Sequence, residues 1–333
     1  SDLLTRQLDA ARARGDARAV SSLTLRIVDL AGFGGLAGVT PRPDAREGII
    51  DLLRGSLDVA PDDRALLTRL LGMLGLGDDP LDRADVMERL LAVETAEAAP
   101  ALGEALAALR QELGDEDGVT RALALAHGRA PDHAPTRDRL SAWYAAREAW
   151  PELTELLGGV AGRETDPQAA VARYREIASL YSTRLGDPGR AADALRAARK
   201  LSPEDGALLS ELVQVLDASG DRGAAEEELS RALDGTEGVR RAELLRLRAW
   251  LSLRHADDVQ AIADLEEALA LGDPAASAEL SAALFERLRR TVEQGDADGE
   301  RAVILRLVAL VGPSDPAQVE EAPYGFLDQV VWA

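Results

Sequence analysis

Arginines cluster near the C-terminal end of the chain, where their guanidinium groups could hold carboxylates. The cluster comprises Arg240, Arg241, Arg246, Arg248, Arg287, Arg289 and Arg290. A guanidinium fork binds a carboxylate through two parallel N–H bonds, so these residues could recognise an acidic partner. The same segments carry Glu243, Glu279 and Glu286 at helical spacing. Ion pairing within the helices is therefore the favoured interpretation.

The remaining residue types that carry chemistry do not form a catalytic or metal-binding pattern. His127, His133 and His255 are the only histidines, and none has carboxylates at the spacing of a metal site. The chain contains no cysteine, which excludes disulfides and thiolate ligands. No serine lies in the G-x-S-x-G context of a nucleophile. We expect a non-enzymatic chain with no cofactor and no metal.

Two further patterns are interpreted as structural. Gly32, Gly34, Gly35 and Gly38 resemble a phosphate-binding loop, but they follow a helical run and no strand precedes them, which favours a helix junction. The run Glu226–Glu228 is typical of the solvated face of a helix.

The elements that position these residues repeat along the chain. Gly186-Asp187-x-Gly189-x-Ala191, with Leu195 and Ala198, recurs 34 residues later as Gly220-Asp221-x-Gly223-x-Ala225, with Leu229 and Ala232. Such a period indicates stacked units that bury their apolar faces against their neighbours. Glycine can end a helix with positive φ, and aspartate can cap the next one. Helical periodicity with short breaks predicts about sixteen helices.

These positions resemble the tetratricopeptide repeat (TPR) family, whose second helix reads A-x3-F-x2-A. The best copies supply Ala191, Leu195 and Ala198, then Ala225, Leu229 and Ala232. The resemblance implies an all-α fold: an α-solenoid of stacked antiparallel helix pairs that winds into a right-handed superhelix.

The predicted organisation has five parts. They are an N-terminal helix pair (1–31), a Gly/Pro-rich junction (32–46), divergent helical repeats (47–130), TPR-like repeats (131–312) and an apolar C-terminal tail or capping segment (313–333). The tail holds Tyr324, Phe326 and Trp332. We expect it to pack on the last helix pair; the alternatives are that it occupies the groove or forms a homo-oligomer contact.

Composition narrows the classes of partner. The net charge of −21 disfavours nucleic acid and anionic membrane surfaces, and no apolar run is long enough for membrane insertion. The abundance of Arg and Ala with a single lysine, Lys200, is typical of GC-rich bacterial coding. Because the sequence starts without Met inside a helical pattern, we expect a fragment of a longer bacterial protein, with a soluble, cytoplasmic location favoured.

If the resemblance holds, the first helices of successive repeats line a concave groove that contacts a partner protein or peptide. The predicted groove residues are Arg175, Ser179, Ser182, Ser210, Gln214, Asp217, Leu245, Ser252, Ser281 and Phe285. An equally weighted interpretation is that they are only the less buried sides of ordinary helices. The family's carboxylate clamp uses Lys and Asn, and this chain has no asparagine and keeps its lysine outside the groove.

The leading hypothesis is a non-catalytic protein-protein interaction scaffold. The alternatives are a structural or assembly subunit of a larger complex, and the recruitment region of a multidomain enzyme.

Overall fold

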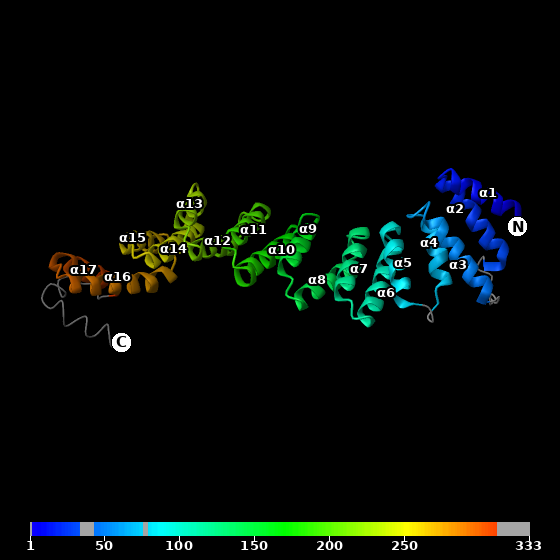
Figure 1. Ribbon diagram of the computed structural model, residues 1–333. Helices are drawn as coiled ribbons and strands as arrows, with labels where there is room; N and C mark the ends of the chain where they lie inside the picture. The colour runs from blue at the N-terminus through cyan, green and yellow to red at the C-terminus, as the bar shows by residue number, and fades with distance from the viewer. Residues whose placement is uncertain (1, 34–42, 76–78, 312–333) are drawn as a thin grey trace. The chain divides into compact units, whose positions relative to one another are not determined.

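The computed structural model describes residues 2–33, 43–75 and 79–311, which form helices joined by short turns (Figure 1). No strand occurs within these ranges. The chain divides into two compact units, Ser1–Ala149 and Trp150–Ala333. The predicted all-α repeat fold is confirmed.

The first unit contains eight α-helices and one π-helical segment among its described residues. These are α1 (Asp2–Ala13), α2 (Ala17–Val28), η1 (Asp29–Phe33), α3 (Pro43–Leu57), α4 (Arg64–Met73), α5 (Pro80–Val93), α6 (Ala99–Glu112), α7 (Glu116–Arg129) and α8 (Ala134–Ala146). An apolar cluster joins α2 to α5 around the fully buried Leu53, Leu66 and Leu67. Helices therefore continue through the described residues of 47–130, the segment predicted to hold divergent repeats.

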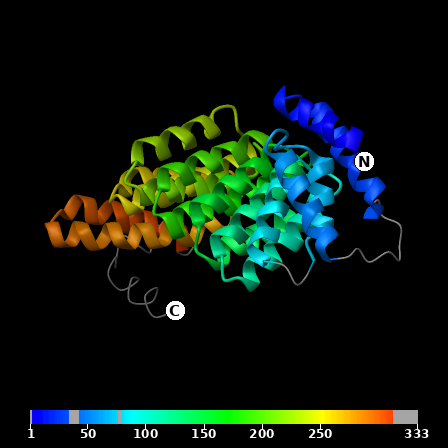
Figure 2. The same ribbon diagram turned by 45° about the vertical axis from the view of Figure 1, so that its right-hand side comes forward.

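The second unit contains nine α-helices and one π-helical segment among its described residues. These are α9 (Trp150–Ala161), α10 (Pro167–Leu180), η2 (Tyr181–Leu185), α11 (Pro188–Leu201), α12 (Gly206–Ala218), α13 (Arg222–Leu233), α14 (Gly238–Arg254), α15 (Asp258–Ala270), α16 (Ala275–Gln294) and α17 (Ala297–Val311). Consecutive helices pack as neighbours, as α16 and α17 show in orange and red-orange in Figure 2.

The Gly-Asp turns have the geometry that the sequence predicts. Gly220 ends α12 with φ of 81°, and the carboxylate of Asp221 accepts a hydrogen bond from the backbone N–H of Ala224 at 3.1 Å. A left-handed glycine costs little, and the aspartate satisfies an N–H group that the helix leaves unpaired. The same combination occurs at Gly15-Asp16, Gly114-Asp115 and Gly186-Asp187. The turn chemistry thus repeats with the helix pairs.

Small residues lie where paired helices approach each other. Ala198 of α11 and Ala225 of α13 are fully buried, and Leu195 and Leu229 lie beside them in the core. The phase of the repeat that the sequence predicts is therefore right at these positions.

Several predicted boundaries can be placed in the structure. Helix α3 begins at Pro43, inside the predicted junction 32–46. The predicted boundary at residue 130 lies between α7 and α8, inside the first unit. The tail 313–333 and the glycines at 34, 35 and 38 lie outside the described residues.

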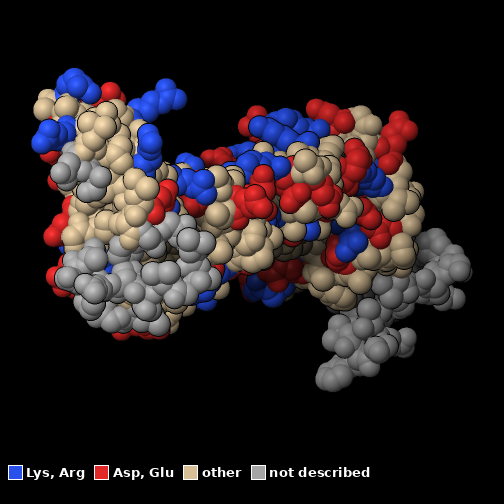
Figure 3. Space-filling model, turned by 90° about the vertical axis from the view of Figure 1, so that its right-hand side faces the viewer, with Lys and Arg blue, Asp and Glu red and all other residues tan. Residues whose placement is uncertain are grey.

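Charged side chains are interleaved on the face that Figure 3 shows, with basic groups beside acidic ones. Among the described residues, no helix has the length and apolar character needed to cross a membrane.

Candidate binding groove

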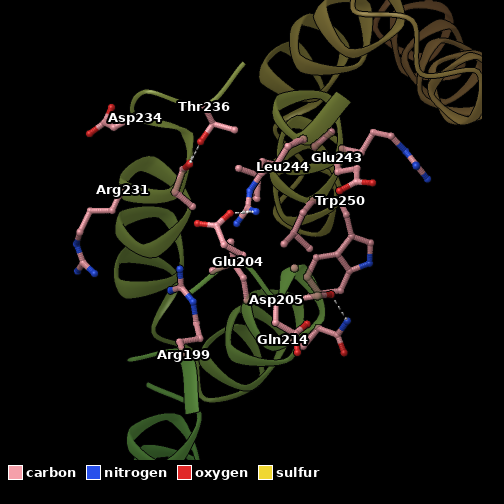
Figure 4. A pocket seen from close by; sticks show the side chains of 18 of the residues that line it. Arg199, Glu204, Asp205, Gln214, Arg231, Asp234, Thr236, Glu243, Leu244 and Trp250 are labelled. Carbon is pink, nitrogen blue, oxygen red and sulfur yellow. Dashed lines mark hydrogen bonds and ion pairs between the residues drawn. The ribbon is translucent and has the colours of Figure 1, made fainter. Parts of the chain in front are cut away.

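A groove of about 1070 Å³ opens between the first helices of two adjacent repeats in the second unit. Its walls come mainly from α12 and α14, with contributions from the segments 203–205 and 234–237 and from residues of α11, α13, α15 and α16 (Figure 4). We call it the α12/α14 groove. Because both walls are helices of the repeat framework, the side chains that line it are held by the same packing that builds the core.

The bottom of the groove is apolar. Leu209, Leu244 and Leu265 are buried there, with 6% or less of each exposed. Leu247 and Trp250 of α14 also line the groove and are only half-buried. Large apolar side chains in a concavity are the usual anchor sites of binding surfaces.

The α12 wall carries small polar groups. Ser210 is half-buried and Gln214 is exposed, and the side-chain amide of Gln214 donates to the Ser210 hydroxyl at 3.2 Å. Figure 4 shows Gln214 and the Trp250 ring on the lining of the same groove. These groups could hydrogen-bond to the backbone of an extended ligand.

The arginines that line the groove already have carboxylate partners. Arg199 and Arg231 donate to Glu228 at 2.9 and 3.0 Å. Arg240 pairs with Glu204 across the repeat.

Arg246 pairs with Asp273 at 3.2 Å and also with Glu279. Hydrogen bonds to Glu279 raise the pKa of Arg246 above its ordinary value although burial opposes them. Each of these four guanidinium groups is thus engaged within the protein.

Glu228 is an enclosed carboxylate beside the groove. Only 6% of its side chain is exposed, and Arg196 of α11 donates to it at 3.1 Å in addition to Arg199 and Arg231. Burial by itself raises the pKa of Glu228, but hydrogen bonding and the three positive charges outweigh it, so the pKa lies below its ordinary value. The sequence-based expectation that Glu226–Glu228 is wholly solvated is wrong for Glu228, because its carboxylate joins α11 to α13.

Three other carboxylates on the lining have no such partner. Asp234, Glu237 and Glu243 are exposed, and no ion pair reaches them from the described residues. Glu237 stands at the N-cap of α14 without a side-chain capping bond. The unpaired charge of the groove is therefore negative.

Behind Trp250, a cluster of charged groups ties α14 to α12. Arg254 stacks on the Trp250 ring, with 5.1 Å between the guanidinium carbon and the ring centroid, and donates to Asp217 at 2.5 Å. Nε2 of His255 lies 2.6 Å from the other oxygen of Asp217, whose side chain is only 4% exposed. Burial raises the pKa of the Asp217 carboxyl, but these two partners outweigh it and hold the pKa below its ordinary value.

A second concavity of about 460 Å³ lies between α10 and the start of α12. Arg175 lines it and donates to Glu211 at 3.2 Å. Asp205 borders both this concavity and the α12/α14 groove. First helices therefore line both hollows, as the TPR resemblance implies.

The sequence-predicted site residues fall into different environments. Arg175, Ser210 and Gln214 line the concavities. Ser179 and Ser182 are exposed but line neither of them, and Ser281 and Phe285 are half-buried outside them. Asp217 is occupied by Arg254 and His255.

Leu245 and Ser252 do not face the groove, which corrects the prediction for α14. Their exposed fractions are 0% and 5%. The repeat lengthens to 36 residues here, so Leu245 occupies the core position that Leu209 holds in α12. Arg246 and Leu253, one residue further along, line the groove, together with Glu243, Leu247 and Trp250.

The C-terminal arginine cluster is ion-paired, but mostly between helices, so the favoured interpretation of pairing within the helices is right only for Arg289 and Arg290. Arg241 binds Glu267 at 2.6 Å, and Arg248 binds Asp264 through two hydrogen bonds of 2.8 and 2.6 Å. Arg287 donates to Asp258 of the preceding helix at 3.0 Å. Among the predicted partners, Glu286 pairs within its own helix, with Arg289 and Arg290.

His133 and His255 take part in local structural contacts. Nδ1 of His133 accepts a hydrogen bond from the backbone of Thr136 at the start of α8. No group of His, Asp and Glu residues in the described parts of the chain has the geometry to hold a metal ion.

Trp250, Leu247 and Glu243 line the groove but were not among the groove residues predicted from the sequence. The signal was present: Leu208-Leu209 and Leu244-Leu245 are equivalent buried pairs 36 residues apart. When α12 and α14 are aligned on these pairs, Trp250 holds the same repeat position as Gln214.

Comparison with known proteins identifies the repeat. A family model described as tetratricopeptide repeat matches residues 182–251, which cover most of η2 to α14 and so most of the groove. No protein of curated function matches the chain.

Solved structures of similar architecture include three with different origins. A tetratricopeptide repeat protein from Parabacteroides merdae is 15% identical, with 72% of this chain and 93% of that chain covered and a TM-score of 0.28. BtubC (BKLC) from P. vanneervenii is 20% identical, with 73% and 90% covered and a TM-score of 0.32. A human IFIT1 dimer with PPP-AAAA is 12% identical, with 93% and 83% covered and a TM-score of 0.33.

The assignment rests on the family match together with the repeating turns and helix pairs. Repeats of this type generally serve as interaction scaffolds and are typically non-catalytic. Residues 182–251 match the tetratricopeptide repeat family model, and the described residues on both sides of that segment form further helices of an all-α repeat fold.

Proposed function

We propose that the chain is a non-catalytic scaffold that binds an extended segment of a partner protein in the α12/α14 groove. The observation that carries this proposal is the pair Leu247 and Trp250, two large apolar side chains left half-buried in a concavity. Elsewhere in the same repeats, leucines at helix contacts are buried almost completely, as at Leu212 and Leu229. A binding partner would complete the burial of Leu247 and Trp250.

The dimensions of the groove favour a peptide segment. Its volume of about 1070 Å³ is far larger than one side chain requires. Apolar groups line the bottom, while Ser210 and Gln214 on one wall can pair with backbone amides. This division of roles suits an extended chain that inserts one side chain and runs along the wall.

Selection from a displayed random peptide library tests the proposal. Peptides enriched on the intact chain would be measured against Trp250→Ala and Leu247→Ala by fluorescence anisotropy. Val259→Ala is the matched control, because Val259 of α15 is an apolar residue that is 63% exposed and lies outside the groove.

We expect both groove variants to lose most of the binding while the control retains it. Circular dichroism melting of each variant would establish that it is folded. Enriched peptides that bind all three variants as tightly as the intact chain would contradict the proposal.

A further inference from the structure

We infer that the α12/α14 groove selects a cationic peptide segment, with a Lys or Arg two to three residues from a large apolar side chain. The inference rests on the proposed function and deepens it by naming the chemistry of the partner. It follows from which charges in the groove are already paired and which are free.

Every arginine that lines the groove already pairs with a carboxylate of the protein. Arg199 and Arg231 share the buried Glu228, Arg240 holds Glu204, and Arg246 holds Asp273 and Glu279. A ligand carboxylate or phosphate would have to compete with these internal partners for the same guanidinium groups. Leaving a carboxylate as enclosed as Glu228 without its cations is costly.

Cationic ligands, in contrast, meet free carboxylates. Glu243, Glu237 and Asp234 are exposed on the lining, and no described residue pairs with them. The carboxylate of Glu237 is not used to cap α14. The net charge of −21 would also attract a basic segment at long range.

The geometry of α14 sets the spacing between anchor and cation. Glu243, Leu247 and Trp250 stand at positions i, i+4 and i+7, so they lie on one face of the helix. From Glu243, the rise along the helix is about 6 Å to Leu247 and about 10 Å to Trp250. An extended chain covers that range in about two to three residues. An apolar side chain seated between Leu247 and Trp250 therefore places a cation two or three residues away beside Glu243.

The test uses short synthetic peptides with acetylated and amidated ends, so that no terminal charge contributes. All the peptides contain one tryptophan as the anchor. They differ at a single position, two residues from the tryptophan, which is Lys, Glu or Ala. Their affinities are measured by fluorescence anisotropy at physiological salt for the intact chain, Glu243→Lys and Trp250→Ala. Glu155→Lys is the matched control, since Glu155 is an exposed carboxylate of α9 without an ion pair among the described residues.

We expect the Lys peptide to bind the intact chain about tenfold more tightly than the Glu peptide. Glu243→Lys should reverse that preference, Glu155→Lys should preserve it, and Trp250→Ala should weaken both peptides. Circular dichroism would confirm that each variant is folded.

The two possible failures are distinguishable. If the Lys and Glu peptides bind equally and both depend on Trp250, the charge selection is wrong while the groove remains the binding site. If no peptide binds, or if binding ignores Trp250→Ala, both the inference and the proposed function are overturned.

Discussion

Two carboxylates in adjacent helices, Glu228 of α13 and Glu243 of α14, have opposite environments. Glu228 is almost fully enclosed and receives hydrogen bonds from three arginines. Glu243 is exposed on the groove lining and receives none from the described residues. The comparison indicates that Glu228, on a second helix, helps to hold α11 and α13 together, whereas Glu243, on a first helix, remains available to a ligand.

The largest effect on stability is expected from substitutions of the small residues at the contacts between helices. Ala225→Arg should lower the free energy of unfolding by more than about 3 kcal/mol, because it overpacks a fully buried site and introduces an unpaired charge. Ala198→Arg should behave alike. Glu227→Arg, at an exposed position of the same helix, should melt close to the intact chain. Equal melting of all three would show that the helix phase is wrong.

Removal of the enclosed carboxylate should have the next largest effect. We expect Glu228→Ala to cost about 1 to 3 kcal/mol, since it leaves three arginines without their shared partner although all three retain contact with solvent. Glu226→Ala is the matched control, because Glu226 forms a surface pair with Arg222 in the same helix. Urea unfolding of both variants measures the difference. Equal losses of unfolding free energy in the two variants would mean that Glu228 does not stabilise the contact between α11 and α13.

The pH dependence of that difference sharpens the comparison further. The folded pKa of Glu228 lies below its ordinary value, so the ionised carboxylate stabilises the fold above the unfolded pKa, about 4.3. This contribution is lost as pH falls through the lower, folded pKa. The stability gap between the intact chain and Glu228→Gln should therefore shrink below about pH 4. A gap that stays constant from neutral pH into this acid range would refute the pairing.

The smallest change in stability is expected from a substitution on the groove lining. Glu243→Lys should alter the free energy of unfolding by less than about 0.5 kcal/mol, because Glu243 is exposed and no described residue depends on it. Thermal melting beside Glu155→Lys provides the comparison. A large loss from Glu243→Lys alone would assign this carboxylate a structural role.

The helical repeat could be predicted from the sequence, because the residues that mark each turn and each helix contact are close together in the chain. A glycine such as Gly220 and an aspartate such as Asp221 build each turn from residues that are adjacent in the chain. Ala198 and Ala225 could likewise be placed in the core by periodicity alone.

The site could be predicted only in part, because it depends on relations between repeats. In α14, leucines occupy both the core and its margins, and the repeat lengthens from 34 to 36 residues, so Leu245 lies in the core and not on the expected surface. Pairs such as Arg240 with Glu204 join residues that are far apart in the chain. Periodicity within one helix carries no signal for such contacts.

Hydrogen–deuterium exchange of the intact chain, with and without the Lys peptide, tests the central claim most directly. Ligand binding should slow exchange in the segments 203–214 and 236–253, which form the groove walls, and should leave 17–28 in the first unit unchanged. Protection confined to the first unit, or no protection at peptide concentrations that saturate binding, would contradict the assignment of the α12/α14 groove as the binding surface.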